Sequence, residues 1–292
     1  MLKRIFFLII SILVSSVCFA FDSTKEAITF SGITMPYRKC VIHGTDEAAK
    51  PSLVVYLHGG SSKGNDNETQ LKEPGTDSIA NYLEASGRSA IFLIPQCPSN
   101  MSWGGPMNNV LKAMIDRYVN AGDVNADRIY IFGGSMGGTG TWGMLSAFPD
   151  LFAAAMPVAG NPSKCLAENV SKTPVFTVMG TADNIMSVNA AQTFINTLQA
   201  LGDDVCMEVE DGWTHEMTCI ESYTKRRLDW IFAHERGMTS AIRPVSVQRE
   251  TIVESLYYTL DGRPVKNPSS SHVYLRKEVL SDGRVEVKKI CH

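Results

Sequence analysis

A serine in a glycine-rich turn is the residue of this chain best placed to do chemistry. Ser135 stands in Gly133-Gly134-Ser135-Met136-Gly137, directly after the short apolar run 129–132. The run predicts a buried strand, and the residues after the turn, up to about Phe148, predict a helix. A turn of the G-x-S-x-G type lifts a serine hydroxyl above the sheet edge. The helix that follows aims its N-terminal N–H groups at the same point, so this hydroxyl is a candidate nucleophile.

Two other interpretations of the same stretch compete with this one. Gly138, Gly140 and Gly143 satisfy G-x-G-x-x-G, a pattern of dinucleotide-binding turns. That pattern belongs at the strand-to-helix turn itself, whereas here it begins after the turn, and we discount it. Ser135 is alternatively only a small turn residue, an interpretation that depends on whether partners for the hydroxyl exist.

A serine hydroxyl needs a base to remove its proton, and the base needs a carboxylate to orient it. In one recurrent arrangement the chain order is serine, acid, histidine. The histidines after Ser135 are His215, His234, His272 and His292. We favour His215, because it alone is expected in a loop just beyond a strand (205–209); His234 lies near a helix end and the other two in a tail.

Asp183 is the expected acid. It follows an apolar strand at 174–179, at the same sheet edge as the serine. The other carboxylates are placed less well: Asp150 lies too soon after the elbow helix, Asp203 and Asp204 precede their strand, and Asp211 lies in the histidine's own loop.

A second turn offers an oxyanion site. The apolar run Ser52–Leu57 ends at His58-Gly59-Gly60-Ser61, and glycines after a strand let backbone N–H groups approach a developing negative oxygen. We expect the donors to be the N–H of Gly60, shared with Ser61, and the N–H of Met136. His58 is expected to hold this turn rather than to take part in the reaction.

Two further loops leave the expected sheet. Trp103 follows the strand at 90–94 and the turn Pro95-Gln96-Cys97-Pro98; it either walls the substrate cleft or packs beneath its own loop, with equal weight. The polar stretch 63–73 contains Asn65-Asp66-Asn67-Glu68. A calcium site was weighed for it, but the glycine and distal glutamate of an EF-hand are missing, so a solvated loop is expected.

The order of elements predicts an α/β fold. Strands expected at 52–57, 90–94, 129–132, 153–158, 174–179 and 205–209 alternate with helices at 79–85, 106–120, 187–201 and 219–232. This alternation indicates a mainly parallel sheet with helices on both faces. An antiparallel hairpin at 27–30 and 35–41 precedes it. The catalytic domain is assigned to 21–238 and a linker to 239–250.

Residues from about 24 to 236 resemble an α/β-hydrolase. The resemblance is to the secreted carboxylesterase, polyhydroxybutyrate-depolymerase-like and predicted-peptidase branch, and it is carried by Leu57-His58-Gly59-Gly60, Pro95-Gln96-Cys97-Pro98, Ser102-Trp103-Gly104 and the run from Gly133 to Trp142. Asp183 and His215 match the acid and base of that family. The bulky Met136 beside the serine is a departure. The resemblance implies acyl transfer without a metal or organic cofactor, on esters that include acyl or feruloyl groups of polysaccharides.

The N-terminal residues indicate an exported protein. Residues 1–20 are typical of a signal peptide: Lys3 and Arg4, an apolar centre, then Cys18-Phe19-Ala20 as a cleavage site. A retained anchor or a lipoprotein at Cys18 fits less well.

The formal charge of −3 leaves no basic field for nucleic acid, and no later stretch is long enough to span a membrane. Six cysteines remain after cleavage, for which one or two disulfides are expected.

Residues 251–292 form a tail of different character. Asp261-Gly262 and Asp282-Gly283 are hairpin signals between alternating segments at 256–260, 272–279 and 285–290. Residues 256–265 and Val273-Tyr274-Leu275 resemble the C-terminal sorting domains of type IX-secreted proteins, although Ser271-His272 replaces the usual glycine. The tail is therefore expected to engage secretion machinery; a small β accessory domain is the alternative.

Three functions are weighed against one another. The first is a secreted ester hydrolase acting on acylated carbohydrate through an open cleft, because 183 follows 135 too closely for a large lid. The second is a serine peptidase of the prolyl-oligopeptidase type, for which no gating domain precedes residue 24. The third is an inactive binding module, which predicts an incomplete set of Ser135, Asp183 and His215.

Overall fold

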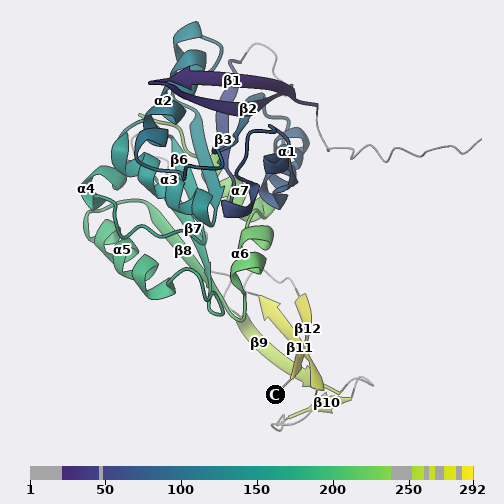
Figure 1. Cartoon of the computed structure of the whole chain (residues 1–292). Helices are drawn as coiled ribbons and strands as arrows, with labels where there is room; N and C mark the ends of the chain where they lie inside the picture. The colour runs from purple at the N-terminus through teal and green to yellow at the C-terminus, as the bar shows by residue number, and fades with distance from the viewer. Residues whose placement is uncertain are drawn as a thin grey trace, which may run out of the picture. The chain divides into compact units, whose positions relative to one another are not determined.

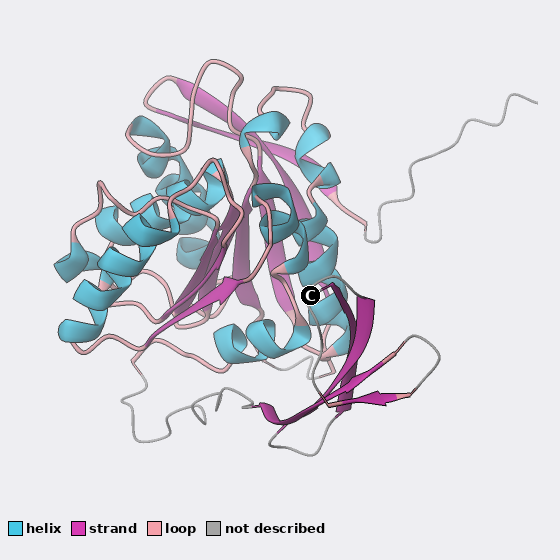
Figure 2. Ribbon diagram, turned by 90° about the horizontal axis from the view of Figure 1, so that it is seen from below, coloured by secondary structure: helices cyan, strands magenta, loops and turns pink. Residues whose placement is uncertain are grey.

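The computed structural model describes residues 22–45, 49–237, 252–259, 263–266, 273–280 and 285–291. The chain divides into two compact units, one ending at Met238 and the other beginning at Thr239. Each is described by itself (Figures 1 and 2). The expected signal peptide lies outside the described residues.

An eight-stranded sheet forms the centre of the first unit, in the order β1-β2-β4-β3-β5-β6-β7-β8. Strands β1 and β2 form an antiparallel hairpin, β2 is antiparallel to β4, and the pairs from β4 to β8 are parallel. The strand bounds are Thr24–Phe30, Ile33–Ile42, Ser52–Leu57, Ala90–Pro95, Ile129–Gly134, Ala154–Val158, Val175–Gly180 and Val205–Glu210 for β1 to β8. The mainly parallel sheet expected from the sequence is confirmed.

Helices cover both faces of this sheet (Figure 2). One apolar cluster contains side chains of α1 and α7, and a second contains side chains of α2, α3 and α5. The helix bounds are Pro74–Ala85, Pro106–Ala121, Met136–Ala147, Ala167–Val170, Val188–Ala200, His215–Glu221 and Lys225–Phe232 for α1 to α7. Strand β3 serves both clusters: Val54 and Tyr56 face one, while Leu53, Val55 and Leu57 face the other. A strand buried on both faces must be apolar throughout, as this one is.

The single helix expected at 219–232 is wrong. The structure has two helices, α6 and α7, separated by Ser222–Thr224. The side chain of Thr214 accepts the Met217 N–H and so starts α6 earlier. Thr224 has extended backbone angles and starts α7 in a new direction. We expected His215 to lie in a loop, but it is the first residue of helix α6.

The polar stretch 63–73 is also not the solvated loop that was expected. It contains the short 3₁₀ helix Thr69–Lys72, in which Gln70 and Leu71 are buried. Asn67 is buried as well, and its amide nitrogen donates to the backbone oxygens of Glu26 and Tyr37. Gln96 accepts the Asn67 N–H at 2.7 Å. Side-chain amides therefore satisfy the backbone groups that this irregular segment leaves without a ladder.

Strand β8 ends the sheet at one edge and carries charges that are all paired. Glu208 accepts hydrogen bonds from both Arg226 and Arg227 at the start of α7, and Glu210 also pairs with Arg227. Arg227 is 3% exposed. Two carboxylates and two guanidinium groups thus fix α7 against the edge strand.

The second unit is a four-stranded antiparallel sheet in the order β10-β9-β11-β12. The strands are Ile252–Tyr258, Pro264–Val265, Val273–Leu280 and Val285–Cys291 for β9 to β12. Strands β11 and β12 agree within one residue with the expected segments 272–279 and 285–290, whereas β9 begins four residues before the expected segment 256–260 and overlaps it only at 256–258. Of the described helices, none has both the length and the apolar character that a bilayer crossing needs.

Free thiols are found at four cysteines of the first unit, so no disulfide joins any two of them: Cys40, Cys97, Cys165 and Cys219.

Asp203, at the amino end of β8, offers a test of this packing. Burial raises the pKa of this carboxyl to about 7, and its Oδ2 has no partner among the described residues. A pKa above the unfolded value means that ionisation costs stability, and the cost is absent below about pH 4 and full above pH 7. We expect Asp203→Asn to raise the free energy of unfolding by about 2 kcal/mol at pH 8, discounted for the partial exposure of the residue.

Urea unfolding at pH 8 and pH 4 measures this difference. The gain should vanish at pH 4, and Asp123→Asn, at an exposed aspartate just after α2, is the control. An equal gain at both pH values would show that the carboxyl is not desolvated in the fold.

Candidate active site

The serine elbow is a strained turn at the sheet edge. Ser135 lies between β5 and α3 with φ 58° and ψ −118°, a conformation that costs an ordinary residue free energy. Its N–H donates to the Val158 oxygen at 3.0 Å, and its own oxygen accepts the Thr139 N–H at 3.0 Å. A Cβ on Gly133 would overlap the Gly137 oxygen, and one on Gly137 would overlap the Leu57 oxygen. Both glycines are therefore required by close backbone approach.

The structure brings together the three residues that were expected to act together. The Ser135 hydroxyl lies 2.7 Å from His215 Nε2, and His215 Nδ1 lies 2.7 Å from Asp183 Oδ2. With the proton on Nδ1, the ring donates to the carboxylate and its Nε2 accepts the serine O–H. The Asp183 side chain is fully buried. Its other oxygen accepts the N–H groups of Ile185 and Met186, both at 2.8 Å, which stabilise the ionised form.

Two adjacent loops hold the acid and the histidine in register. The Ala182 N–H donates to the Trp213 oxygen at 3.0 Å, and the Gly212 N–H donates to the Thr181 hydroxyl at 2.7 Å. The same hydroxyl donates to Asp211. Asp211, the rival acid, is thus occupied by the neighbouring loop, while Asp203 and Asp204 lie at the amino end of β8. The strongly raised pKa of Asp203 therefore belongs to the opposite end of the sheet from Ser135.

His58 is completely buried behind the second turn. Its Nδ1–H donates to the Gly59 oxygen at 2.6 Å, and its Nε2 accepts the Cys97 N–H at 2.9 Å. Burial lowers the pKa of His58 to about 4, so the ring is neutral at physiological pH. The ring ties the turn after β3 to the turn after β4, which agrees with a structural role.

Glu73 is a site residue that sequence reasoning missed. Its Oε1 accepts the Gly59 N–H at 3.2 Å and the Ser62 hydroxyl at 2.6 Å. These bonds fix both ends of the turn that carries Gly60. A Cβ placed on Gly59 would lie 3.5 Å from Glu73 Oε1 and 3.7 Å from the Ser135 Cβ, so the carboxylate approaches the serine closely. The one available signal was an acidic residue directly before Pro74, in the segment that follows the glycine turn.

Trp103 packs beneath its loop and also borders a groove. The ring is 6% exposed, and its Nε1–H donates to the His58 oxygen at 2.9 Å. Its edge contributes to the wall of a cavity along α3. Both of the alternatives weighed for Trp103 therefore describe part of its environment.

The thiol of Cys219 lies against the serine elbow without being a nucleophile. A Cβ on Gly134 would lie 3.5 Å from its Sγ. Burial, together with the negative charges of Glu73 and Asp183, raises the pKa of Cys219 to about 12. The reactive form of a cysteine is the thiolate, so this group stays protonated and inert at neutral pH.

The pKa of His58 predicts an acid-sensitive turn. The unfolded chain takes up a proton near pH 6.5, whereas the folded protein does so near pH 4. The free energy of unfolding therefore has its full value above pH 6.5 and falls by about 3 kcal/mol as the pH is lowered towards 4. We expect His58→Gln to be less stable at pH 7.5 and to lose less of its stability on acidification. Urea unfolding at pH 7.5 and pH 4.5 compares the two; parallel losses in both proteins would contradict the neutral ring.

The Glu73 carboxylate predicts a loss of turnover without a loss of fold. Glu73→Gln keeps the shape but removes the charge from the bonds to Gly59 and Ser62, and charged hydrogen bonds contribute about 1.5–3 kcal/mol. We expect kcat/KM for an aryl acetate to fall about tenfold, with the melting temperature nearly unchanged. Glu84→Gln, on the exposed face of α1, is the control. Wild-type kinetics in Glu73→Gln would exclude a role for the charge.

Comparisons with known proteins identify relatives of parts of this chain. Residues 100–226 match the Dienelactone hydrolase family. Acetylxylan esterase A of Emericella nidulans is 30% identical over 130 residues, 40% of each chain. A probable inactive carboxylesterase of Oryza sativa subsp. japonica is 25% identical over 69% of this chain and 93% of its own. The chain spans less than half of the acetylxylan esterase.

Solved structures show the same fold. A thermostable esterase superposes with a TM-score of 0.68 at 28% identity, covering 74% of this chain and 64% of the esterase. The feruloyl esterase module of Clostridium thermocellum, complexed with sinapinate, gives a TM-score of 0.58 at 16% identity over 73% of this chain and 88% of the module. The first unit of this chain therefore has the α/β-hydrolase fold, with esterases among its homologues.

Proposed function

We propose that this chain is a serine hydrolase that cleaves carboxylic esters through an acyl-enzyme. The observation that carries the proposal is the continuous pair of 2.7 Å hydrogen bonds from Ser135 through His215 to Asp183. A serine, an imidazole and a buried carboxylate in this order are the parts that nucleophilic acyl transfer needs.

The reaction proceeds in two balanced halves. The Ser135 oxygen attacks the ester carbonyl while His215 Nε2 takes the hydroxyl proton. The tetrahedral intermediate collapses, the alcohol leaves with the proton returned by His215, and the acyl group stays on Ser135. Water then attacks the acyl-enzyme, again with His215 as base, and releases the acid. Asp183 keeps the proton on Nδ1 and stabilises the charged ring.

The oxyanion of each tetrahedral intermediate needs donors, and we assign the N–H groups of Gly60 and Met136. Met136 is the first residue of α3, and the first N–H groups of a helix have no intrahelical acceptor. Gly60 belongs to the turn that Glu73 and His58 fix from two sides. One such donor contributes about 3 kcal/mol of transition-state stabilisation in comparable enzymes.

The substrate class proposed is an acyl or feruloyl ester on carbohydrate. Similarity to acetylxylan esterase A and to feruloyl esterase B of Neurospora crassa, the latter 26% identical over 44% of this chain, supports it. Between Ser135 and Asp183 the chain forms α3, β6, the four-residue helix α4 and β7. This segment leaves little chain for a lid, and a bulky ester can reach the serine.

We also propose that the protein acts outside the cytoplasm. The basic start and apolar centre of residues 1–20 support export, and the likeness of residues 256–265 to sorting domains supports a role of the tail in secretion. The test expresses the chain with and without residues 251–292 and measures the amount and the size of the mature protein that reaches the culture medium. Equal export of both forms would remove the sorting role from the tail.

Labelling with a fluorophosphonate tests the nucleophile. We expect wild-type protein to be labelled and to hydrolyse aryl acetates, and Ser135→Ala to lose both, because a methyl group cannot attack the probe. Ser86→Ala, at an exposed serine just after α1, is the control. Labelling that persists in Ser135→Ala places the nucleophile elsewhere. Parallel assays on peptide amides separate ester hydrolysis from the peptidase alternative.

A further inference from the structure

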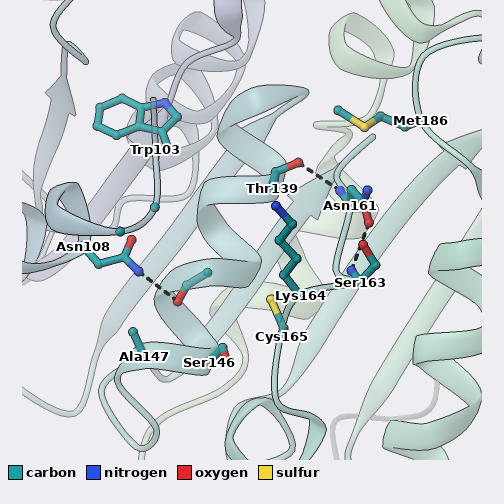
Figure 3. Close-up of a pocket in the computed structure, with 13 residues that line it drawn as sticks. Trp103, Asn108, Thr139, Ser146, Ala147, Asn161, Ser163, Lys164, Cys165 and Met186 are labelled. Atoms are coloured by element: carbon teal, nitrogen blue, oxygen red, sulfur yellow. Dashed lines mark hydrogen bonds between the residues drawn. The ribbon is translucent and has the colours of Figure 1, made fainter. Parts of the chain in front are cut away.

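A groove of about 620 Å³ lies along α3, and the residues that line it are drawn in Figure 3. Four segments line it: the start of α2 with Asn108, the outer face of α3, the loop after β6, and Met186 after β7. Trp103 and Met186 lie at one end of the drawn set and Ala147 at the other. The volume is within the range of small-molecule sites in proteins.

Thr139 and Met186, at one end of this groove, form hydrogen bonds to Ser135 and Asp183 of the proposed active site. Thr139 lies one helical turn after Ser135, and its N–H donates to the Ser135 oxygen. Met186 donates its N–H to the buried Asp183 carboxylate. A substrate with its carbonyl at Ser135 therefore meets the groove directly.

The outer face of α3 leaves the groove open because its residues there are small. Thr139, Gly143, Ser146 and Ala147 follow one another along the helix. At 1.5 Å per residue, Thr139 and Ala147 are about 12 Å apart, a longer span than a single sugar ring. A Cβ on Gly143 would make ordinary contacts of 3.8 and 3.9 Å with the Asn108 amide. Close packing therefore does not require this glycine, and its smallness keeps the groove free.

Hydroxyl, amide and ammonium groups alternate with apolar surface in the rest of the lining. Asn108, Asn161, Ser163 and Lys164 all present polar atoms. Asn108 Oδ1 is buried and has no partner in the described part of the chain. An apolar acyl chain would leave such groups without hydrogen bonds at a cost of about 1–3 kcal/mol each, whereas the hydroxyl groups of a sugar can pair with them.

We infer that the groove along α3 binds the carbohydrate chain on the alcohol side of the ester. The inference rests on the proposed function and adds to it the binding site and the size of the substrate. The scissile ester lies at the Thr139 end, and further sugar units extend towards Ala147. Midway along the groove, Asn108 Nδ2 donates to the Gly143 oxygen at 3.4 Å, and its Oδ1 is the acceptor offered to a sugar hydroxyl.

Filling the groove at Gly143 tests the inference. The readout is the ratio of kcat/KM for an O-acetylated xylo-oligosaccharide to kcat/KM for an aryl acetate. We expect Gly143→Leu to lower this ratio about tenfold, mainly through KM of the oligosaccharide, which corresponds to about 1.4 kcal/mol of binding. Gly143→Ala should lower it less, because it adds one methyl group. Gln192→Leu, on the exposed face of α5, should leave the ratio as in wild type.

Each other outcome has a defined meaning. An unchanged kcat/KM ratio in Gly143→Leu would overturn the inference that the groove binds carbohydrate. A preference of the wild-type protein for an acetylated monosaccharide over the oligosaccharide would also overturn it. A loss confined to peptide esters in place of sugar esters also overturns it, in favour of an extended peptide. Activity that persists in Ser135→Ala defeats the proposed function instead, whatever the ratio shows.

Binding without turnover provides a second measurement. Titration of Ser135→Ala with unesterified xylo-oligosaccharide should give saturable heat, and the double variant with Gly143→Leu should give about tenfold weaker binding. Equal affinity in the two proteins would contradict the site even if both fold normally.

Discussion

The close approach of helix α3 to strand β3 is the constraint on which the rest of the site depends. At Gly137 the helix backbone lies so near the Leu57 oxygen that no side chain fits between them. This contact brings the start of α3, with Ser135 and Met136, next to the turn after β3. The two proposed oxyanion donors come from these two segments, so a single packing requirement sets their separation.

The strain at Ser135 is maintained by the same arrangement. Its positive φ is held because its N–H and oxygen both bond to neighbouring elements, β6 and α3. The apolar strand β5 before it is buried on both faces. The free energy that the turn costs is therefore offset by the packing of a whole strand and helix, which is how folded proteins sustain strained functional residues.

Much of this was predictable from the sequence because it depends on local pattern and chain order. Uniform apolar runs identified the six parallel strands within one or two residues, and the order Ser135, Asp183, His215 selected three residues that the fold brings within hydrogen-bond distance. The break between α6 and α7 was missed because the apolar pattern continues through it. Thr214 and Thr224 were the only signs of separate helix starts.

Long-range polar contacts were beyond the reach of pattern. Glu73 bonds to a glycine N–H 14 positions earlier, and the 63–73 segment is fixed by amide groups of Asn67 and Gln96. A polar segment looks the same in sequence whether it is solvated or folded on itself. A raised pKa is equally ambiguous, since the pKa of Asp203 is raised mainly by burial and this residue lies at the amino end of β8, the opposite end of the sheet from Ser135.

The paired charges of strand β8 have a consequence for association between molecules. A strand at the end of a sheet offers unpaired backbone groups to any extended chain that approaches it. On β8 the carboxylates of Glu208 and Glu210 are tied down by arginines of α7. An incoming strand would have to displace these partly exposed ion pairs before it could align. The edge nearest the histidine loop is thereby protected against fibril-like stacking at high protein concentration.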